Sequence, residues 1–377
     1  MNTEKVLGII VEYNPLHKGH LYHLNMAKQL VNPKYTVALM SGNFTQRGLP
    51  AVLDKFTRTS LALYYGVDMV VELPVIYAMG AAQYFAFGSI NILNSLPVTH
   101  LCFGAEEENL SKLWKCAEIL AHEPPEFKSV LKQGLKEGLS YPKAREFALK
   151  AVNSSVRLLP NNILAVEYLK ALIQTSSSII PINIKRDSKF LSATCINQNL
   201  RKGNYKILEE LPDLTAEALV KNKDSAVNLD NYSSIFHYKL LSNDLEKYLD
   251  IKEGLDNRLR KAATEFFNIS QIITGTKTKR YTQTRLQRII LQILLDITKE
   301  DMDRWRSPPY VRVLGLKKEA ASLLKNVDNL VMNIKKARLI EGRELLEKEI
   351  SATDIYYLGQ NRGGKGYEYK EAIRTNP

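Results

Sequence analysis

The stretch that most constrains the fold is residues 7–24, LGIIVEYNPLHKGHLYHL. Residues 7–11 form a near-continuous apolar run, which is typical of a parallel strand buried on both faces. Asn14-Pro15 ends that run, because proline cannot continue a central strand and restricts the residue before it. After His17-Lys18-Gly19-His20, apolar residues recur three positions apart from Leu21 onward. The pattern predicts a buried strand, a tight loop and a helix.

The loop and the helix start favour a phosphate-binding site. The first turn of a helix presents unpaired N–H groups and the positive end of the helix dipole. Gly19 lets a phosphate approach the backbone without an intervening side chain. The imidazoles of His17 and His20 can donate hydrogen bonds to phosphate oxygens, and more strongly as charge develops in a transition state. These two histidines are therefore the candidate catalytic residues.

Other interpretations of the histidines compete with this one. His17, His20 and His23 are evenly spaced, as in a metal site, but no cysteine or carboxylate completes a ligand set beside them. His17 also precedes the helix, so we predict no metal site. His23 has two open interpretations: a direct ligand of the substrate, or a helix-face histidine that is hydrogen-bonded to a neighbour.

Length and composition predict a cytoplasmic protein with two domains. The chain has 377 residues, and its three cysteines lack metal-ligand spacing and fit a reducing compartment. The apolar run near the N-terminus ends at Asn14-Pro15, unlike a signal peptide, and the later run at residues 289–295 is too short to span a bilayer. We therefore expect no membrane segment. The net charge of +12 suits a polyanionic partner.

The first half of the chain alternates between strand and helix patterns. Strands are expected at residues 7–11, 35–40, 69–73, 100–103 and 178–185. Helices are expected after the first strand and at residues 55–65 and 83–96. This alternation is typical of an α/β fold with a Rossmann-like, doubly wound parallel sheet.

Ligands of such sheets bind outside the carboxyl ends of the strands, and several residues fall there. The loop at residues 41–54 carries Gln46 and Arg47, which could grip substrate or belong to an ordinary surface loop. Gly104 lets a ligand approach the backbone, or simply makes a turn. Asn161 stands at a helix start, where it could be only a cap, and Arg186 leaves the last strand, where a cation suits a triphosphate.

From about Gly203 onward, helical patterns follow with no further strand–helix alternation. We expect an ATP-binding domain at residues 1–203, a mainly helical RNA-binding domain at 204–358 and a mobile, glycine-rich tail at 359–377. Between residues 266 and 295 there is no acidic residue, yet basic residues gather there. The candidate RNA-binding residues are Lys277, Lys279, Arg280, Tyr281, Arg285 and Arg288. Tyr281 could stack on a base, whereas the alternative is a solvated basic face without a partner.

The motif at residues 14–20 resembles the signature of the HIGH-motif nucleotidyltransferase superfamily, and more closely that of the bacterial tRNA(Met) cytidine acetate ligase family. Leu16 and Lys18 depart from that family's usual Asn-Pro-Phe-His-Asn-Gly-His. Later segments are also similar to the family: GLDNRL, GTKTKRYTQTRLQR, PYVRVLGL and ATDIYYL. The resemblance therefore covers nearly the whole chain.

The resemblance implies a ligase with ATP as cosubstrate, acetate as acyl donor and elongator tRNA(Met) as acceptor. Acetate would be activated to acetyl-adenylate, and the acetyl group would pass to the exocyclic amine of the wobble cytidine. It also implies that Asn161 and Arg186 contact ATP. With the motif region, the expected ATP-binding residues are Ile10, Val11, Glu12, Tyr13, Asn14, Pro15, Leu16, His17, Lys18, Gly19, His20, Leu21, Tyr22, His23, Gly104, Asn161 and Arg186. Mg²⁺ could accompany the ATP, held mainly by phosphates and water.

One departure weakens the match. The family has an arginine after its Ser-Ala-Thr element, where this chain has Asn197. Arg201 or Lys202, one helical turn further on, could replace that arginine, or the enzyme could be slower or altered. Two rival functions stay open: a small-molecule nucleotidyltransferase, which the loop motif alone would permit, and an RNA-binding protein with a degenerate nucleotide site.

Overall fold

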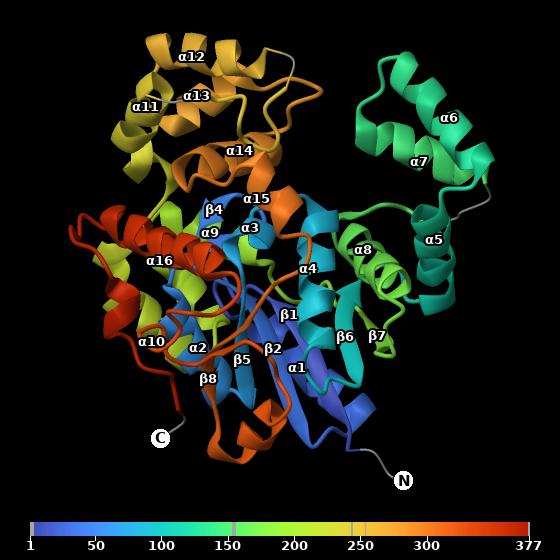
Figure 1. Cartoon of the computed structure of the whole chain (residues 1–377), viewed down its shortest axis with the longest axis vertical. Helices are drawn as coiled ribbons and strands as arrows, with labels where there is room; N and C mark the ends of the chain where they lie inside the picture. Colours follow the sequence, from blue (N-terminus) through green and yellow to red (C-terminus); the bar gives the residue numbers. More distant parts are fainter. Residues whose placement is uncertain (1–3, 153–155, 243, 253, 376–377) are drawn as a thin grey trace.

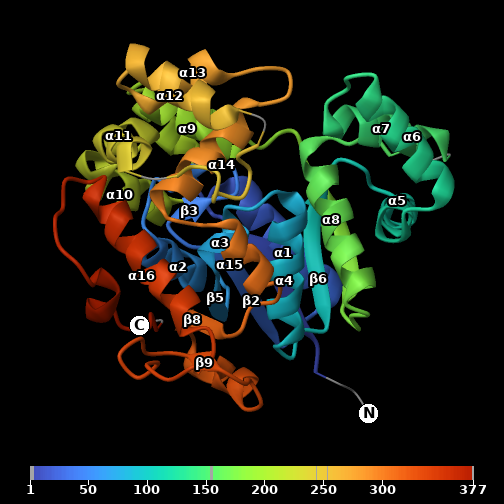
Figure 2. The same cartoon turned by 45° about the horizontal axis from the view of Figure 1, so that its top comes forward.

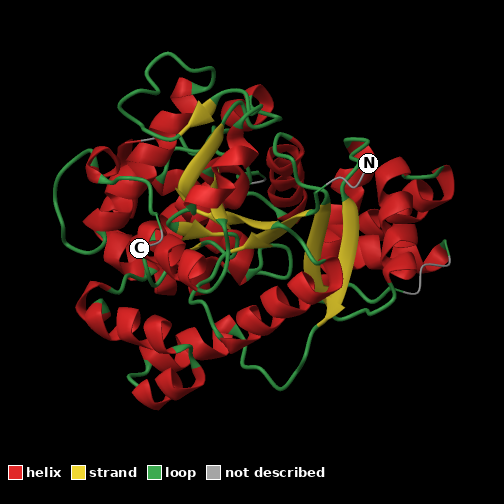
Figure 3. Cartoon of the chain, turned by 90° about the horizontal axis from the view of Figure 1, so that it is seen from below, coloured by secondary structure: helices red, strands yellow, loops and turns green. Residues whose placement is uncertain are grey.

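The structure is a computed structural model and describes residues 4–152, 156–242, 244–252 and 254–375. Its centre is a seven-stranded sheet with the order β7-β6-β1-β2-β5-β8-β9 (Figures 1 and 3). The strands are β1 (Val6–Val11), β2 (Tyr35–Ser41), β5 (Met69–Leu73), β6 (His100–Ala105), β7 (Ile180–Lys185), β8 (Val311–Leu316) and β9 (Leu330–Val331). A small ribbon pairs β3 (Phe44–Thr45) with β4 (Leu49–Pro50).

The first five strands of the large sheet are parallel, with β1 in the middle. β1 pairs with β2 on one side and with β6 on the other. The chain runs outward from β1 through β2 to β5, then crosses to β6 and β7 on the other side, so the strand order reverses beside β1. Open α/β sheets bind ligands at such a point. The predicted Rossmann-like, doubly wound parallel sheet is confirmed, and the residues after β1 and β6 lie at its ligand-binding position.

Both faces of the parallel sheet are covered by helices, because alternate strand residues point to opposite faces. Along β2, Val37 and Leu39 belong to one apolar cluster, whereas Ala38 and Met40 belong to the other. The first cluster includes residues of α4 (Ala82–Asn94), α5 (Leu110–His122) and α8 (Pro160–Gln174). The second includes residues of α1 (Lys18–Val31), α2 (Lys55–Tyr64), α9 (Ala193–Arg201) and α10 (Asp213–Lys221).

Two groups of helices stand above the carboxyl edge of the sheet, on opposite sides (Figures 1 and 2). One group contains α6 (Pro125–Lys136) and α7 (Tyr141–Ala151), and the other contains α11 (Ser233–Ser242), α12 (Leu255–Glu265), α13 (Ile269–Thr276) and α14 (Gln283–Leu294). The short helix α3 (Val75–Ala78) lies between β5 and α4, and the short helix α15 (Lys299–Arg304) follows α14. In the described part of the chain, no helix combines the length and apolar character that crossing a membrane requires.

The chain returns to the sheet near its end, and this corrects the expectation that no strand follows residue 203. β8 pairs antiparallel with β5, and β9 pairs parallel with β8. β8 is buried along its whole length. Its sequence, VRVLGL, is a short apolar run without a neighbouring strand–helix repeat, so alternation could not reveal it.

The expectation of a mobile tail at residues 359–377 is also wrong for most of that segment. After α16 (Arg343–Leu358), Glu368 is 1% exposed, and Arg374 exchanges backbone hydrogen bonds with Leu314 and Leu316 of β8. Residues 376–377 of the expected tail and residues 1–3 of the expected first domain lie outside the described residues. The boundary at residue 203 stays a prediction.

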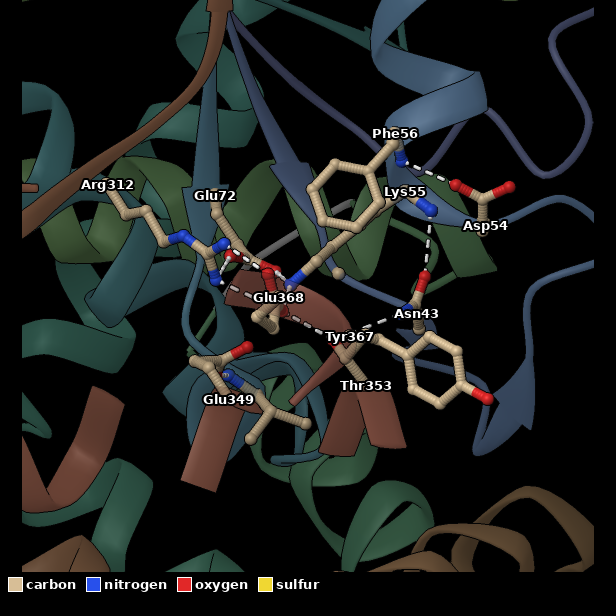
Figure 4. A network of polar contacts seen from close by, with 12 residues as sticks. Asn43, Asp54, Lys55, Phe56, Glu72, Arg312, Glu349, Thr353, Tyr367 and Glu368 are labelled. Atoms are coloured by element: carbon tan, nitrogen blue, oxygen red, sulfur yellow. Dashed lines mark hydrogen bonds and ion pairs between the residues drawn. The ribbon is translucent and has the colours of Figure 1, made fainter. Parts of the chain in front are cut away.

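A buried ionic network fastens this C-terminal segment to the sheet (Figure 4). Lys55 and Arg312 both pair with Glu72, at 2.6 Å from its two carboxylate oxygens, and both also pair with Glu368. Glu349 accepts a hydrogen bond from the backbone N–H of Val75. The network joins α2, β5, β8, α16 and the 3-10 helix η5 (Tyr367–Lys370). Polar residues of the last quarter of the chain thus pack against the parallel sheet and α2.

Candidate functional site

The site begins where β1 ends, in a loop held from three directions. Residues 12–17 connect β1 to α1, with Tyr13 in the left-handed region at φ 47° and a cis bond between Asn14 and Pro15. Asn14 Oδ1 accepts a hydrogen bond from the backbone N–H of Val52, at 2.8 Å. Asn197 of α9 donates to the backbone carbonyl of Asn14, at 3.0 Å. These bonds fix the approach of the chain to His17.

A buried arginine also holds this loop, and no local sequence pattern indicates its role. Arg58 of α2 is fully buried, and its guanidinium donates to the carbonyls of Glu12 and Ser41, at 2.6 and 3.0 Å. It also donates to the carbonyls of Gly42 and Leu53. Arg58 therefore ties the carboxyl ends of β1 and β2 together through backbone groups.

His17 and His20 each hold the start of α1 with one ring nitrogen. His17 Nδ1 accepts from the backbone N–H of Gly19 at 3.1 Å, and His20 Nδ1 accepts from the backbone N–H of His17 at 3.3 Å. The two rings stack with centroids 3.7 Å apart. Because each Nδ1 is an acceptor, the proton of each neutral ring lies on Nε2. Both imidazoles are thus prepared as Nε2–H donors at the positive end of a helix.

Burial keeps these rings neutral. It lowers the pKa of His17 to about 4, helped by the nearby charge of Arg186. The pKa of His20 is also lowered well below its usual value, by burial and by the nearby His17, His23 and Arg186. A neutral donor suits an anionic ligand here. The free-energy cost of burying a charged imidazolium is avoided while the site is empty, and the neutral ring can still donate a hydrogen bond when the ligand arrives.

His23 faces β6 and fits the interpretation of a satisfied helix-face histidine. Its Nε2 lies 3.8 Å from Cys102 Sγ. Burial lowers its pKa to about 4, while a backbone hydrogen bond with Phe103 acts in the opposite direction. Throughout the described ranges, no three or more His, Cys, Asp or Glu side chains form a group that could hold a metal ion.

The candidates after β6 and β7 lie at the same edge. A Cβ added to Gly104 would lie 3.9 Å from His23 Cδ2, so Gly104 and the helix bearing the histidines face each other. Asn161 donates through Nδ2 to Glu106, at 2.7 Å, while Asn162 Oδ1 accepts from the backbone N–H groups of Glu106 and Glu107. The neighbour Asn162 therefore caps the loop, and Asn161 retains an Oδ1 acceptor. Arg186 is exposed beyond the end of β7.

Most of the other expected ATP-binding residues are parts of this loop and helix start. Ile10 and Val11 end β1, Glu12 to Leu16 form the loop, and Leu21 and Tyr22 lie in the first turns of α1. Lys18 is different, because its ammonium donates to the carbonyl of Glu209 at 2.8 Å.

The loop at residues 41–54 reaches α9, which answers part of the question raised by Asn197. Arg47 Nη1 donates to Thr194 Oγ1 at 2.8 Å, and the backbone N–H of Gln46 donates to the buried carboxylate of Glu12 at 2.7 Å. Burial raises the pKa of Glu12, whereas Arg47 and Arg58 lower it. Asn197 itself is occupied with Asn14. Arg47 is therefore the guanidinium that this structure places at the first turn of α9.

The basic residues of the helical region divide into two sets. Lys277, Lys279 and Arg280 are exposed in the loop between α13 and α14. Tyr281 is only 5% exposed, and its hydroxyl donates to the carbonyl of Lys252 at 2.8 Å. Arg285 covers the tyrosine ring at 4.8 Å. The expectation that Tyr281 offers its ring to a base is therefore wrong for this structure, because side-chain packing covers it.

The same packing corrects the interpretation of the cluster as uncompensated. Asp250 lies 3.6 Å from the guanidinium of Arg285. Burial lowers the pKa of Arg288, and Asp250 opposes that effect. A carboxylate from a different segment thus neutralises this end of the cluster, which the local sequence could not show. An RNA role remains a prediction for the exposed residues.

A doubly wound sheet with two histidines at the helix start after β1 is typical of nucleotidyltransferases. Comparisons with known proteins identify the family. The family model "HIGH Nucleotidyl Transferase" matches residues 4–370, and the chain belongs to this family. Within it, the chain belongs with the tRNA(Met) cytidine acetate ligases. That of Caldanaerobacter subterraneus subsp. tengcongensis is 42% identical over 94% of this chain and 95% of its own. That of Caldicellulosiruptor saccharolyticus is 42% identical over 94% of each chain.

Solved structures agree with this assignment. The crystal structure of Thermotoga maritima TmcAL bound with alpha-thio ATP matches with a TM-score of 0.91, 31% identity and 99% of each chain covered. Its apo form matches with a TM-score of 0.90 at the same identity and coverage. The α/β nucleotidyltransferase fold with a helical C-terminal region is thereby confirmed.

Proposed function

We propose that the protein is an ATP-dependent ligase that forms acetyl-adenylate and acetylates the exocyclic amine of the wobble cytidine in elongator tRNA(Met). The relatives carry that name, and the matching structure holds an ATP analogue. The observation that carries the proposal is the pair of neutral, Nε2-protonated histidines at the start of α1, beside the sheet's switch point.

In this proposal the protein positions the reactants and stabilises charge. An acetate oxygen attacks the α-phosphorus of ATP, and pyrophosphate leaves with the bonding electrons. The Nε2–H groups of His17 and His20 donate to phosphate oxygens whose charge grows in that step. The N–H groups at the start of α1 contribute in the same direction, and Arg186 and Arg47 supply cationic charge at the edge. Mg²⁺ would enter with the triphosphate, since the described residues offer no ligand cluster of their own.

In the second step, the cytidine amine attacks the acetyl carbonyl, AMP departs, and the amine loses a proton. We place the ATP contacts on the residues around β1 and α1, with Gly104, Asn161 and Arg186, and we expect the protein to act in the cytoplasm, where ATP and tRNA meet. The proposed contact of Asn161 with ATP is supported by its side-chain Oδ1, since its amide nitrogen is held by Glu106.

The first experiment is ATP–pyrophosphate exchange with and without acetate, followed by transfer of labelled acetyl to tRNA. Acetate-dependent exchange together with transfer to the wobble cytidine is the expected result. Exchange that needs a different small acid, or a nucleotide product without RNA acylation, would instead support a small-molecule nucleotidyltransferase. Binding of RNA without any exchange would support the degenerate-site alternative.

The proposed tRNA surface is tested by charge reversal. Replacing Lys277, Lys279 and Arg280 with glutamate should weaken tRNA binding, and each lost phosphate contact should reduce the salt slope of log affinity by about 0.7–0.9. The exchange reaction should persist. The matched control reverses Lys325, Lys335 and Lys336, which are exposed near β8 and β9 and give the same change in net charge. Equal weakening by both triple variants would show a non-specific charge effect.

A further inference from the structure

A cavity of about 560 Å³ lies beside the nucleotide edge without being part of it. Its walls come from the loop at residues 41–54, from α9 and α10, and from α13 and α14 of the helical region. Neither His17 nor His20 lines it, and neither do Gly104, Asn161 or Arg186. A volume of this size is ordinary for a small-ligand site, so the cavity has room for a ligand group other than the ATP phosphates.

Asn14 separates the cavity from the rest of the loop at residues 12–17 that leads to His17, and we call it the Asn14 partition. Asn197 and Val52 both line the cavity, and both hydrogen-bond Asn14, through its carbonyl and its Oδ1 respectively. Asn14 stands three residues before His17 in the loop. An occupant of the cavity would therefore sit next to the reaction centre but behind the Asn14 partition.

The lining suits a flat, polar-edged group. Apolar side chains such as Leu49 and Leu200 alternate with the amides of Asn197, Gln283 and Gln287. Asn197 Oδ1 is buried and has no hydrogen-bond partner among the residues that the structure describes. Tyr205, another lining residue, is 53% exposed and offers a ring for stacking. Apolar faces with amide donors and acceptors at the edge are how proteins hold an unstacked nucleobase.

The cavity is also lined by the two helices that flank the exposed basic loop. α13 ends at Thr276 and α14 begins at Gln283, so residues 277–282 connect two helices that both line the cavity. Arg201 and Lys223 add positive charge to the lining. A single-stranded RNA whose phosphates follow this loop would therefore have a base-sized opening beside it.

We propose that this cavity binds one unstacked nucleobase adjoining the acceptor base in the anticodon loop, and so sets the register of the acceptor at the nucleotide edge. This rests on the proposed function, since it presupposes an RNA acceptor. The Asn14 partition separates the cavity from the adenylate, which is why the adjoining base, rather than the acceptor itself, is the occupant.

The test fills the cavity and removes bases one at a time. Ala226 lines the cavity and is exposed, so Ala226→Trp can place an indole into it from the rim. Anticodon stem–loops with a single abasic position are titrated against the wild type and this variant. In the wild type, one abasic position next to the acceptor should weaken binding about 5- to 150-fold, the range for loss of one stacked base. In Ala226→Trp the intact RNA should bind that much more weakly, and the same abasic position should cost nothing further.

Three readouts separate this inference from the others. Ala321→Trp, an exposed alanine of η4 (Lys318–Leu324) outside the cavity, is the matched control and should bind every RNA as the wild type does. Melting curves detect whether the indole of Ala226→Trp disturbs folding. If it does, Tyr205→Ala serves as the second cavity variant, and in it too the same abasic position should cost nothing further. Acetate-dependent exchange should persist in all three variants, so its absence in the wild type would defeat the proposed function alone. Equal abasic costs in wild type and both cavity variants, or loss of exchange in Ala226→Trp only, would overturn the nucleobase pocket.

Discussion

At the scale of single residues, His17 and His20 each carry two roles on one ring. Nδ1 of each ring accepts a backbone N–H at the start of α1, and this fixes Nε2 as the protonated nitrogen. The structural role and the chemical role are therefore on different atoms. Substitutions that preserve one atom and remove the other can separate them.

His17→Asn should separate them most cleanly. Asparagine is a favourable N-cap and keeps an acceptor for Gly19 N–H, so the melting temperature should remain close to that of the wild type. It has no donor at the Nε2 position, so the exchange rate should fall by about 10²–10³. His17→Ala should lose both, with about 1 kcal/mol of stability as well. Near-normal exchange in His17→Asn would remove His17 from the catalytic step.

The lowered histidine pKa values predict a pH dependence. A His17 pKa of about 4 means that the ring is neutral above pH 5, so kcat/KM for ATP should show no protonation step of this ring near pH 6.5. The unfolded chain takes up the proton near 6.5, whereas the folded chain does so near 4. The free energy of unfolding should therefore decrease as pH falls between those values, by up to about 1.4 kcal/mol per pH unit for this residue. Histidine NMR titration, with His17→Asn to assign the signal, measures this directly.

Gly104→Ala tests whether nucleotide occupies the edge of β6. The added Cβ would lie 3.9 Å from His23 and 4.0 Å from the carbonyl of Ile184, which are ordinary contacts, so the apo protein should melt as the wild type does. If ATP packs against this backbone, its affinity should fall about tenfold, or 1.4 kcal/mol, by calorimetry. Gly363→Ala is the control, because its Cβ would meet nothing within 4 Å. Unchanged ATP affinity in Gly104→Ala would move the nucleotide away from β6.

At the scale of elements, the loop at residues 41–54 joins β2 to the substrate edge. It contacts α9 through Arg47, and it reaches α14, where a Cβ on Gly48 would lie 2.4 Å from the backbone nitrogen of Arg288. The loop at residues 41–54 thus contacts both α9 and α14, the helix that follows the basic loop at residues 277–282. We therefore predict that Arg47 takes the place of the family arginine that this chain lacks at position 197.

Two variants decide between an anchoring and a substrate role for Arg47. Thr194→Val removes the hydrogen bond to Arg47 but leaves the guanidinium. Arg47→Ala removes both. If Arg47 contacts phosphate, its alanine variant should raise KM for ATP about tenfold or more in the exchange assay, while Thr194→Val changes it little. Equal effects in the two variants would mean that Arg47 only fastens the loop to α9.

The elements that could be predicted are those whose sequence patterns lie within one short segment of the chain. β1, the Asn-Pro loop and α1 were predictable because apolar periodicity, a proline and a helix-start pattern coincide within residues 7–24. β8 was not, because its pairing partner β5 lies far away in the chain. The burial of Tyr281 and the partner of Arg285 depend on Lys252 and Asp250, which likewise come from another segment. Contacts over long sequence separations set the limit in each case.

At the scale of the whole molecule, the ionic network makes the C-terminal segment part of the nucleotide fold. Three carboxylates, Glu72, Glu349 and Glu368, face two cations, Lys55 and Arg312. Burial raises the pKa of Glu349 well above its usual value, with the charge of Glu72 acting in the same direction. A protonated Glu349 leaves two carboxylates for two cations. The network is therefore balanced only while one proton remains in it.

Replacing Glu368 and Glu349 with glutamine, one at a time, tests that charge balance. Although burial raises it, Arg312 and Lys55 bring the pKa of Glu368 to about 2, below the unfolded value near 4.5. Its stabilisation is thus present above pH 4.5 and is lost as pH falls toward 2. Glu368→Gln should cost about 3–5 kcal/mol of unfolding free energy at pH 7, because it leaves buried cations without a partner.

Glu349→Gln should behave in the opposite way. In the wild type, the unfolded chain releases the Glu349 proton above pH 4.5 while the folded chain keeps it, so this group lowers stability as pH rises toward its folded pKa. Glutamine has no proton to release and still accepts from Val75 N–H. Denaturant unfolding should therefore give a variant whose stability, relative to wild type, improves from pH 5 to pH 8. A variant that instead loses several kcal/mol at pH 8, as Glu368→Gln does, would mean that Glu349 is ionised and serves as a partner of Lys55 and Arg312.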